Sequence, residues 1–543
     1  PTSTVNKNIM ANIAIYGSHN GSIALEDEGK YYVVEFERFF NIKNIGLAQY
    51  KPLRYREEAV YAMLQYFEKE LGYSAPFDNM LHINTECVHD DITYSYKDFI
   101  QANNVLEGWH HHAHASGSFY QSNFSKALIF SFDGGGNDGF FNIFTADRDT
   151  GVTYLDKTNP ADRTDYDYDF GFPYMCFAHF CPDIRQEWIS DGNLVYSGKI
   201  MGLCNFGKCR EEWLPYFKEF YYAKPDGENY LTKLETIIGK NCNLVFDENN
   251  QLDKELSWDV AATSQQAFEE CFFEVANPYL KKYKDLPIII TGGCGLNILL
   301  CTKIKQDFPE RESFVAPNTN DCGIAVGLLA GFKKPKTPID ITYGGMELLD
   351  KNTYPAWIES NSAKPINLDA ISNELAAGKI FGVARGRSEH GPRALGNRSI
   401  ICNPAFPEMK DILNQKVKNR EWYRPFAPVV RLEDVSEYFE WEGESKHMLY
   451  CPKVRKKWRK KLSSITHVDD TARVQTITRE QNEFLYDLIT VFKEKAGHGV
   501  LLNTSFNIAG KPILNTINDA VKVLEKTQMD YLIIEDFYYG KHW

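Results

Sequence analysis

Short apolar runs that end in glycine-containing turns recur along the first half of the chain. The mostly apolar run Asn12–Tyr16 is followed by a turn at 19–22 and by further strand-like runs. The same order returns at Ala127–Phe132, where a turn at 133–139 leads into the strand-like run Phe140–Thr145. Short apolar runs bounded by turn residues are typical of buried strands, so each copy predicts a strand, a tight turn and a returning strand.

A third apolar run, Leu286–Thr291, leads into a glycine turn at 292–297 and then into a helix-like stretch, and helical patterns at 50–71 and 261–283 separate the strands. Strands that alternate with helices, with glycine turns at the strand ends, predict an α/β layered fold. Repeated strand–turn–strand units are typical of a duplicated ATPase domain of the actin, sugar-kinase and heat-shock type. Glycine in such turns lets backbone N–H groups approach a phosphate closely, because it has no Cβ.

The composition changes near residues 332–353, where a Lys- and Pro-rich run precedes a pair of glycines and a polar stretch. Such a segment is typical of a linker. A chain of 543 residues also exceeds the usual size of one domain. We therefore expect a first domain over residues 1–350 and a second α/β domain over residues 351–543.

Composition argues against several classes of protein. No apolar run approaches the ~20 residues of a membrane span, and the polar start lacks the apolar centre of a signal peptide. The 12 cysteines include no CxxC pair, which indicates reduced thiols rather than a zinc ribbon or a disulfide framework. A net charge of -13 argues against a general nucleic-acid binder. We expect a cytoplasmic protein without nucleic-acid or membrane partners, and a homodimer remains open.

Four histidines lie together in the stretch Trp109–Ala115. If this stretch is helical, His110 and His114 lie four residues apart and project from one face, where they can bind one metal ion. Asp133 at a strand end and Asp321 in a second turn before a helix supply two carboxylates. Nitrogen and oxygen donors together suit Fe(II), Mn(II) or Zn(II). The alternative is a packed or solvated histidine face with two aspartates that only form turns.

The second half carries a dense group of basic and small polar residues. Four arginines fall within the 16 positions of Ala384–Ser399, among them Arg393 between a proline and an alanine. Further along come the basic segment 415–426, Thr471–Arg473 and Leu502–Asn507. Arginine binds phosphate and carboxylate oxygens bidentately, and Ser, Thr and Asn add neutral donors. In an acidic protein this grouping predicts a pocket for a polyanionic small molecule, and isolated surface ion pairs are the alternative.

Together these motifs resemble those of the bacterial O-carbamoyltransferases of nodulation and antibiotic biosynthesis, a family that includes the tobramycin, cephamycin and novobiocin enzymes. The resemblance follows colinear order over nearly the whole chain. Its matching stretches are Ser18–Ser22, Glu35–Phe39, His110–Ala115, Asp133–Gly136, Ser197–Leu203, Thr291–Asn297, Asp321–Gly323, Gly386–Ser399, Tyr423–Pro428, His467–Gln475 and Asn503–Asn507. The arginine-rich stretches are the most specific of these.

The resemblance implies two domains with different tasks. The first is expected to be a duplicated actin- and sugar-kinase-like domain similar to the threonylcarbamoyl-adenosine transferase TsaD, and the second an α/β domain similar to YrdC. The second domain would form carbamoyl adenylate from carbamoyl phosphate and ATP, with Mg accompanying the ATP. The first domain, with Fe(II) as the expected metal and Mn or Zn as alternatives, would then transfer the carbamoyl group to a hydroxyl of a small-molecule acceptor such as a sugar or natural product.

The resemblance also implies roles for individual residues. The implied metal ligands are His110, His114, Asp133 and Asp321. The implied nucleotide contacts of the first domain are Lys199, Gly292, Gly293 and Asn297. The implied carbamoyl phosphate and ATP site of the second domain comprises Arg393, Lys418, Arg424, Arg473, Asn503 and Ser505. His19 matches a histidine beside the acceptor, and a neutral imidazole there can take the hydroxyl proton as a catalytic base.

Three positions depart from the family pattern: Asn20 and Gly21, where Asp and Ala are usual, and Asp470, where Gly is usual. The first two lie on the acceptor side, and the sequence does not name the acceptor. Two other functions stay open: a catalytically inert metal- and nucleotide-binding regulator, and a threonylcarbamoyl or HypF-type transferase that acts on a macromolecule. HypF is disfavoured because it carries an extra domain and CxxC zinc fingers, and this chain has no CxxC.

Overall fold

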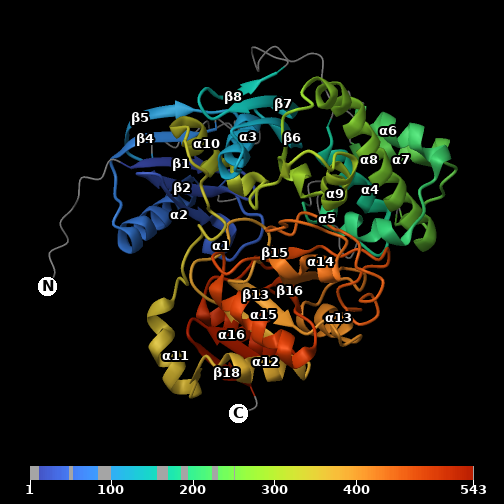
Figure 1. Ribbon diagram of the computed structural model, residues 1–543. Helices are drawn as coiled ribbons and strands as arrows, with labels where there is room; N and C mark the ends of the chain where they lie inside the picture. Colours follow the sequence, from blue (N-terminus) through green and yellow to red (C-terminus); the bar gives the residue numbers. More distant parts are fainter. Residues whose placement is uncertain are drawn as a thin grey trace.

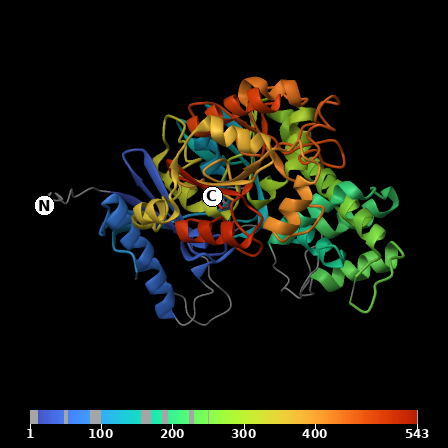
Figure 2. The ribbon, with the colours of Figure 1, turned by 90° about the horizontal axis from the view of Figure 1, so that it is seen from below.

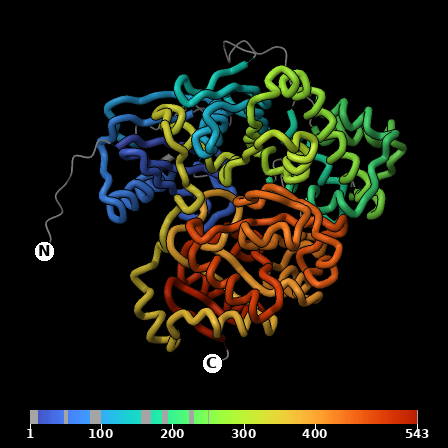
Figure 3. The backbone as a smooth tube through the Cα atoms, in the orientation of Figure 1, coloured from blue at the N-terminus to red at the C-terminus, as the bar shows by residue number. Residues whose placement is uncertain are grey.

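The computed structural model of this protein describes residues 11–47, 53–83, 99–155, 169–184, 194–222, 230–249 and 251–541. In Figure 1 the first half of the chain, from blue to green, lies above the second half, which runs from yellow to red. Figure 3 shows the yellow segment of backbone passing from the upper half to the lower one. Among the helices within the described ranges, none has the length and the apolar character needed to cross a bilayer.

The first sheet contains five strands in the order β3-β2-β1-β4-β5. Their bounds are Asn12–Tyr16 (β1), Ser22–Asp27 (β2), Lys30–Glu35 (β3), Phe77–His82 (β4) and Ala102–Glu107 (β5). β1, β2 and β3 pair antiparallel as a meander, whereas β4 runs parallel to β1 and β5 parallel to β4. The predicted first strand, its turn and the strands that return from it are therefore confirmed.

The second sheet repeats this plan in the order β10-β9-β6-β7-β8. Its strands are Lys126–Gly136 (β6), Gly139–Asp147 (β7), Gly151–Tyr154 (β8), Ile288–Thr291 (β9) and Ser313–Phe314 (β10). Pairing is again antiparallel within the meander and parallel for the last two strands. The shared strand order agrees with the duplication that the repeated sequence pattern predicts. One detail differs, because β6 continues through a shift in register to Gly136 and so shortens the expected turn.

Two helices lie between the two sheets and pack against each other. They are α3 (His110–Gln121) and α10 (Ile324–Lys333), and both share one buried cluster with residues of β1 and β6. A Cβ atom on Gly327 of α10 would lie 2.0 Å from the carbonyl oxygen of Ala113 in α3. The helices therefore cross at backbone contact, and this crossing requires glycine at residue 327.

The outer faces of both sheets are covered by further helices. Helix α2 (Leu53–Tyr66) continues as a π-helical turn at Phe67–Leu71 and packs on the first sheet, while residues 50–52 of the predicted helix lie outside the described ranges. The second sheet carries α4 (Gly171–Phe177), α5 (Val195–Leu203), α6 (Leu214–Tyr222), α7 (Tyr230–Asn241), α8 (Lys254–Lys282) and α9 (Ile298–Asp307). Helix α8 begins earlier than predicted because the Asp253 side chain caps it by accepting from the Glu255 N–H.

The second half is built on one mixed sheet of eight strands in the order β11-β18-β17-β12-β13-β16-β14-β15. Its strands are Lys364–Pro365 (β11), Phe381–Ala384 (β12), Arg398–Cys402 (β13), Ala427–Arg431 (β14), Gln475–Ile477 (β15), Val500–Ser505 (β16), Tyr531–Ile534 (β17) and Phe537–Gly540 (β18). Helices α12 (Leu368–Ala376) and α15 (Glu483–Ala496) cover one face, and α11 (Tyr354–Asn361) and α16 (Ile517–Lys526) the other. Viewed from below in Figure 2, this half lies across the middle of the molecule, between blue α2 and the green helices.

Candidate active site

The predicted histidine ligands, His110 and His114, lie on α3, and the β6–β7 turn fixes where this helix begins. The backbone N–H groups of His110 and His111 donate to the side chains of Asn137 (2.9 Å) and Asp138 (2.8 Å). These bonds satisfy two of the N–H groups that a helix leaves free at its start. The hairpin that carries a predicted aspartate ligand therefore also caps the helix that carries the histidines.

Asp133 is held in place by backbone N–H groups. Its Oδ1 accepts from Gly134 (2.7 Å) and its Oδ2 accepts from Gly293 (2.6 Å). A Cβ on Gly293 would lie 2.7 Å from Asp133 Oδ1, so glycine is needed for this close approach. Gly293, which the sequence predicts as a nucleotide contact, thus also orients a predicted metal ligand.

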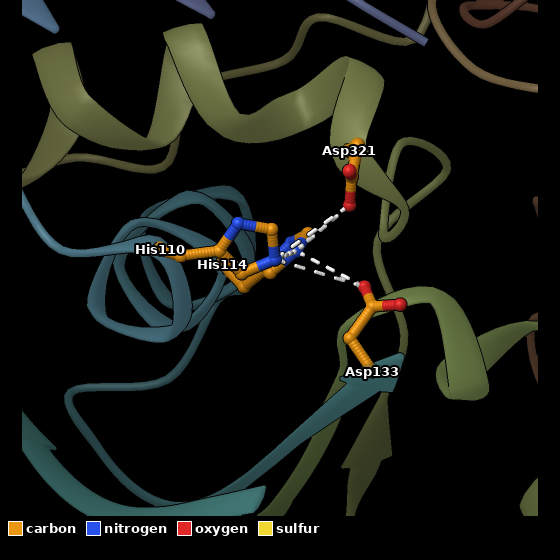
Figure 4. A group of neighbouring side chains, drawn as sticks. All are labelled: His110, His114, Asp133 and Asp321. Carbon is orange, nitrogen blue, oxygen red and sulfur yellow. Dashed lines mark hydrogen bonds and ion pairs between the residues drawn. The ribbon is translucent and has the colours of Figure 1, made fainter. Parts of the chain in front are cut away.

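The four predicted metal ligands converge on one point, as Figure 4 shows. The Nε2 atoms of His110 and His114 lie 3.1 Å apart. Asp133 Oδ2 lies 3.4 Å from His114 Nε2 and 3.9 Å from His110 Nε2, and Asp321 Oδ1 lies 3.5 Å and 3.7 Å from the same two atoms. Four donors bound to one divalent cation at about 2.1 Å stand about 3.4 Å apart. The donor set and its spacing therefore fit one divalent cation.

The charges at this cluster favour a cation. Burial alone would raise the pKa of the Asp133 carboxyl, but hydrogen bonds with His110 and His114 outweigh it and hold that pKa well below its usual range. Burial would lower the pKa of His114, yet its hydrogen bonds to Asp133 and Asp321 raise it to about 9. Burial would also raise the pKa of Asp321, but the charges of His19 and His110 lower it. Two ionised carboxylates therefore face the histidine pair, and a divalent metal ion compensates such a group of charges.

His19 lies at the rim of this cluster, in the turn between β1 and β2. Its Nδ1 is 3.4 Å from Asp321 Oδ2, and its side chain is 45% exposed, so the ring faces open space on its other side. The neighbouring departure from the family pattern has a packing reason. A Cβ on Gly21 would lie 2.6 Å from the ring of Phe36 and 2.7 Å from the carbonyl oxygen of Tyr16. The alanine that is usual here would require that ring to move.

One cavity of about 1170 Å³ joins the cluster to the arginine-rich residues of the second half. From the first half it is lined by His19, Asp133, Lys199, Gly293, Asn297 and Asp321. From the second half it is lined by Arg393, Lys418, Arg424, Arg473 and Ser505. The predicted sites of the two halves therefore open into a shared space.

The predicted anion-binding residues converge because they follow or precede strands at one edge of the eight-stranded sheet. Ser505 ends β16 beside the start of β13, and Arg424 precedes the start of β14. Arg473 precedes β15, which runs parallel to β14. Arg393 comes from the loop that leads into β13. The topology thus brings together side chains that lie far apart in the sequence.

Lys418 is buried against β16 and makes an extensive set of hydrogen bonds. Its Nζ donates to the Ser505 carbonyl (2.6 Å), the Ser505 hydroxyl (3.1 Å) and the Asn507 carbonyl (2.8 Å), and also to the Asn507 side chain. Burial and the nearby charges of Arg420, Lys43 and Arg424 hold the pKa of Lys418 well below its usual range. Lys418 therefore anchors the segment that contains Ser505.

Arg393 and Arg473 present charge to the cavity without a full set of partners. Among the described residues, neither Nε atom has a hydrogen-bond partner. Burial and the charge of Arg424 lower the pKa of Arg393 to about 10, and burial together with Arg393, Arg420 and Arg424 holds the pKa of Arg473 well below its usual range. Guanidinium groups that crowd one another in this way fit a polyanionic ligand, whose charge would relieve the repulsion.

Four predicted site residues have structural partners, and of these only Asn297 and Lys199 line the cavity. Gly292 (φ 84°) packs against β6, where a Cβ would lie 2.2 Å from the Phe132 carbonyl oxygen. Asn503 is buried and donates to the Ala394 carbonyl and the Gln475 side chain.

Asn297 caps α9 by accepting from the Leu300 N–H and pairs with Gln265. Lys199 forms an ion pair with Glu421 of the second half (2.6 Å). Their nucleotide or substrate contacts stay predictions.

Three cationic or polar residues of the cavity were missed as site residues from the sequence. Lys43, Arg420 and His467 all line it. Lys43 stands between an isoleucine and an asparagine with no motif around it, so no local signal marks it. Arg420 and His467 lie inside segments that the sequence singles out, but their spacing alone assigns them no role.

The departure at Asp470 has a conformational explanation. Asp470 has a φ of 67°, a left-handed conformation that favours glycine and that Asp tolerates. Its carboxylate forms an ion pair with Arg459 (2.6 Å), and it does not line the cavity. The extra carboxylate therefore lies away from the predicted anion site.

Two segments that match the family pattern contact each other across the halves. Gly391, in the arginine-rich loop, donates its N–H to Glu35 Oε1 (3.1 Å) and accepts from Arg38 (2.5 Å) at its carbonyl. In the same loop His390 Nε2 lies 2.9 Å from the Cys322 carbonyl, next to Asp321. The loop that carries Arg393 is thereby fixed against the turn that carries Asp321.

Comparison with known proteins gives consistent matches along the chain. Residues 81–329 match the family described as Carbamoyltransferase N-terminus, and residues 372–541 match Carbamoyltransferase C-terminus. The nodulation protein NolO of Bradyrhizobium diazoefficiens is 30% identical over 451 residues, which cover 79% of this chain and 78% of that protein. The 3'-hydroxymethylcephem-O-carbamoyltransferase of Streptomyces clavuligerus is 38% identical over 287 residues, covering 52% of this chain and 53% of that protein.

Similarity to solved structures is weak. Full-length HypF in its phosphate- and nucleotide-bound form matches with a TM-score of 0.34 and 13% sequence identity, over 60% of this chain and 46% of that one. A TM-score this low does not establish a shared fold.

Proposed function

Because this chain belongs to the carbamoyltransferase family, we propose that it is an ATP-dependent O-carbamoyltransferase acting on a hydroxyl of a small-molecule acceptor, a sugar or another natural product. The observation that carries the proposal is the shared cavity, which has a metal-type donor cluster at one end and a group of half-buried arginines at the other. A transferase that first activates a carbamoyl group and then transfers it needs both kinds of site.

The proposal assigns the two tasks to two domains. Residues 1–350 would form the actin- and sugar-kinase-like, TsaD-like transfer domain, and the repeated strand order of its two sheets supports that assignment. Residues 351–543 would form the YrdC-like domain that makes carbamoyl adenylate. The grouping of basic side chains at one edge of the eight-stranded sheet supports the second assignment.

In the activation step, carbamoyl phosphate, ATP and water give carbamoyl adenylate, pyrophosphate and phosphate. Water takes up the phosphoryl group, and the freed carbamate oxygen attacks the α-phosphorus of ATP, from which pyrophosphate leaves. Arg393, Arg424 and Arg473 would bind the phosphate oxygens, because guanidinium groups pair bidentately with them. Lys418 would hold the segment that contains Ser505 beside the same anion.

In the transfer step, the acceptor hydroxyl attacks the carbamoyl carbon and the bond to AMP breaks. His110, His114, Asp133 and Asp321 would hold a divalent metal, Fe(II) first with Mn or Zn as alternatives, which when bound supplies positive charge beside the transferred group. His19 directs Nδ1 toward Asp321, which leaves Nε2 to accept the hydroxyl proton from an acceptor on the open side.

The test is to supply the purified protein with ATP, carbamoyl phosphate and candidate hydroxylated acceptors, and to measure pyrophosphate release and acceptor mass. We expect pyrophosphate release that depends on carbamoyl phosphate, and an acceptor heavier by one carbamoyl group. ATP turnover at the same rate with and without carbamoyl phosphate would contradict the activation step. Binding of ATP and metal without any turnover would instead favour the regulatory alternative.

A further inference from the structure

The two carboxylates of the donor cluster are fixed in different ways. Asp133 accepts from the backbone N–H groups of Gly134 and Gly293. Asp321 precedes α10 in a short 3-10 turn, and no backbone N–H of the described residues donates to its carboxylate. Its orientation must therefore come from neighbouring side chains.

The two oxygens of Asp321 face different neighbours. Oδ1 lies 3.5 Å from His114 Nε2 and 3.7 Å from His110 Nε2. Oδ2 accepts a hydrogen bond from the Tyr16 hydroxyl (2.9 Å) and lies 3.4 Å from His19 Nδ1. Rotation of the carboxylate about its bond to Cβ would exchange these neighbours. The Tyr16 bond is the shortest contact that opposes such a rotation.

Tyr16 is well placed to hold the carboxylate. It ends β1, the central strand of the first sheet, and only 4% of its surface is exposed. Its ring stands edge-on to the ring of His110, with centroids 5.7 Å apart. The phenol hydroxyl donates to Asp321 Oδ2 at 2.9 Å, and the buried ring fixes the direction from which it donates.

We propose that Tyr16 is a positioning residue that turns one oxygen of Asp321 toward the histidine pair and the other toward His19. The inference rests on the proposed function for the metal and for the role of His19. Tyr16 is not one of the four proposed metal ligands, and it does not line the cavity. Removing a side chain that hydrogen-bonds to a metal ligand typically weakens metal affinity by ~10- to 100-fold.

Tyr16→Phe tests the proposal, because it removes one hydroxyl and keeps the ring. Tyr31→Phe is the matched control. Tyr31 lies on β3 of the same sheet, and its buried hydroxyl has no hydrogen-bond partner among the described residues. Affinity for Mn(II) and for Zn(II) is measured on the full chain by competition with a chelator. We expect the dissociation constant of Tyr16→Phe to rise by ~10- to 100-fold and that of Tyr31→Phe to stay within about twofold.

A second measurement separates positioning from general damage. With metal at saturating concentration, Tyr16→Phe should transfer the carbamoyl group from preformed carbamoyl adenylate more slowly, while pyrophosphate release stays unchanged. Unchanged metal affinity in Tyr16→Phe overturns the proposal. A Tyr16→Phe chain that does not fold also overturns it, since a hydroxyl that only positions Asp321 is dispensable for folding. Failure of the wild-type chain to bind metal would instead count against the proposed metal site.

Discussion

Replacing Arg473 by methionine should lower activity without lowering stability. Arg473 lines the cavity, and its Nε has no hydrogen-bond partner among the described residues. Burial and the charges of Arg393, Arg420 and Arg424 oppose its own charge, which shows that these groups crowd one another before a ligand binds. Methionine keeps most of the side-chain volume and removes the charge, so the substitution deletes the anion contact and also relieves the crowding.

The loss of the anion contact and the relief of repulsion differ in free energy. Losing a charged hydrogen bond to a bound anion costs ~2–4 kcal/mol, which corresponds to a roughly 30- to 1000-fold fall in the rate of pyrophosphate release. Relief of repulsion is smaller, because these guanidinium groups open onto the cavity, where solvent screens their charges. We expect ~0.5–1 kcal/mol of added stability in the ligand-free protein, or a rise in melting temperature of up to about 2 °C.

The assay pairs pyrophosphate release from ATP and carbamoyl phosphate with thermal melting of the ligand-free chain. Arg479→Met is the control, because Arg479 is exposed and its ion pairs with described residues are those to Glu483 and Asp487. It should leave both readouts near wild type. If Arg473→Met melts earlier than wild type in proportion to its loss of activity, Arg473 supports the fold and the reasoning about the anion pocket is wrong.

Three further predictions concern histidines. His114→Ala should abolish metal binding and transfer while pyrophosphate release continues, and metal analysis that finds a full complement would refute the ligand assignment. His19→Ala should slow transfer from preformed carbamoyl adenylate by ~10²–10⁴ with metal content unchanged, whereas a lower melting temperature with proportionate transfer would indicate a packing role. His498 is buried with no partner for either ring nitrogen among the described residues, and burial together with Lys461 lowers its pKa to about 4. As pH falls through 6.5, His498 is protonated in the unfolded chain, whereas in the folded chain it stays neutral until about pH 4. His498 therefore lowers the free energy of unfolding as pH falls from 6.5 toward 4. His498→Phe should retain up to about 2 kcal/mol more of its stability at pH 5, and urea unfolding curves with the same pH dependence as wild type would contradict this.

The fold could be predicted where local pattern and local structure coincide. Apolar runs such as Asn12–Tyr16 and Leu286–Thr291 became strands, and the repeated turns after them became the corresponding ends of two similar sheets. The exact end of β6 could not be predicted, because Asp133–Gly136 continue the strand through an irregular register that depends on β7. The early start of α8 depends on one capping aspartate, Asp253, at a position where turn and cap patterns look alike.

The candidate site divides in the same way. The sequence placed His110 and His114 on one helix face, Asp133 at a strand end and Asp321 in a turn. The structure brings these four side chains together. Contacts between residues hundreds of positions apart leave no such pattern. The bond from Tyr16 to Asp321 and the entry of Lys43 into the cavity arise only when the sheets and the second half are assembled.

The crossing of α3 and α10 at Gly327 has a consequence for the spacing of the four donors. His114 is carried by one of these helices, and Asp321 begins the 3-10 turn that leads into the other. A methyl group at Gly327 would meet the Ala113 carbonyl at 2.0 Å and force the helix axes apart. The histidine nitrogens and the Asp321 oxygen would separate with them, and a wider set of donors suits an ion of larger radius. If the donor cluster binds a metal as proposed, the spacing of its donors depends in part on a glycine that lies outside the cluster.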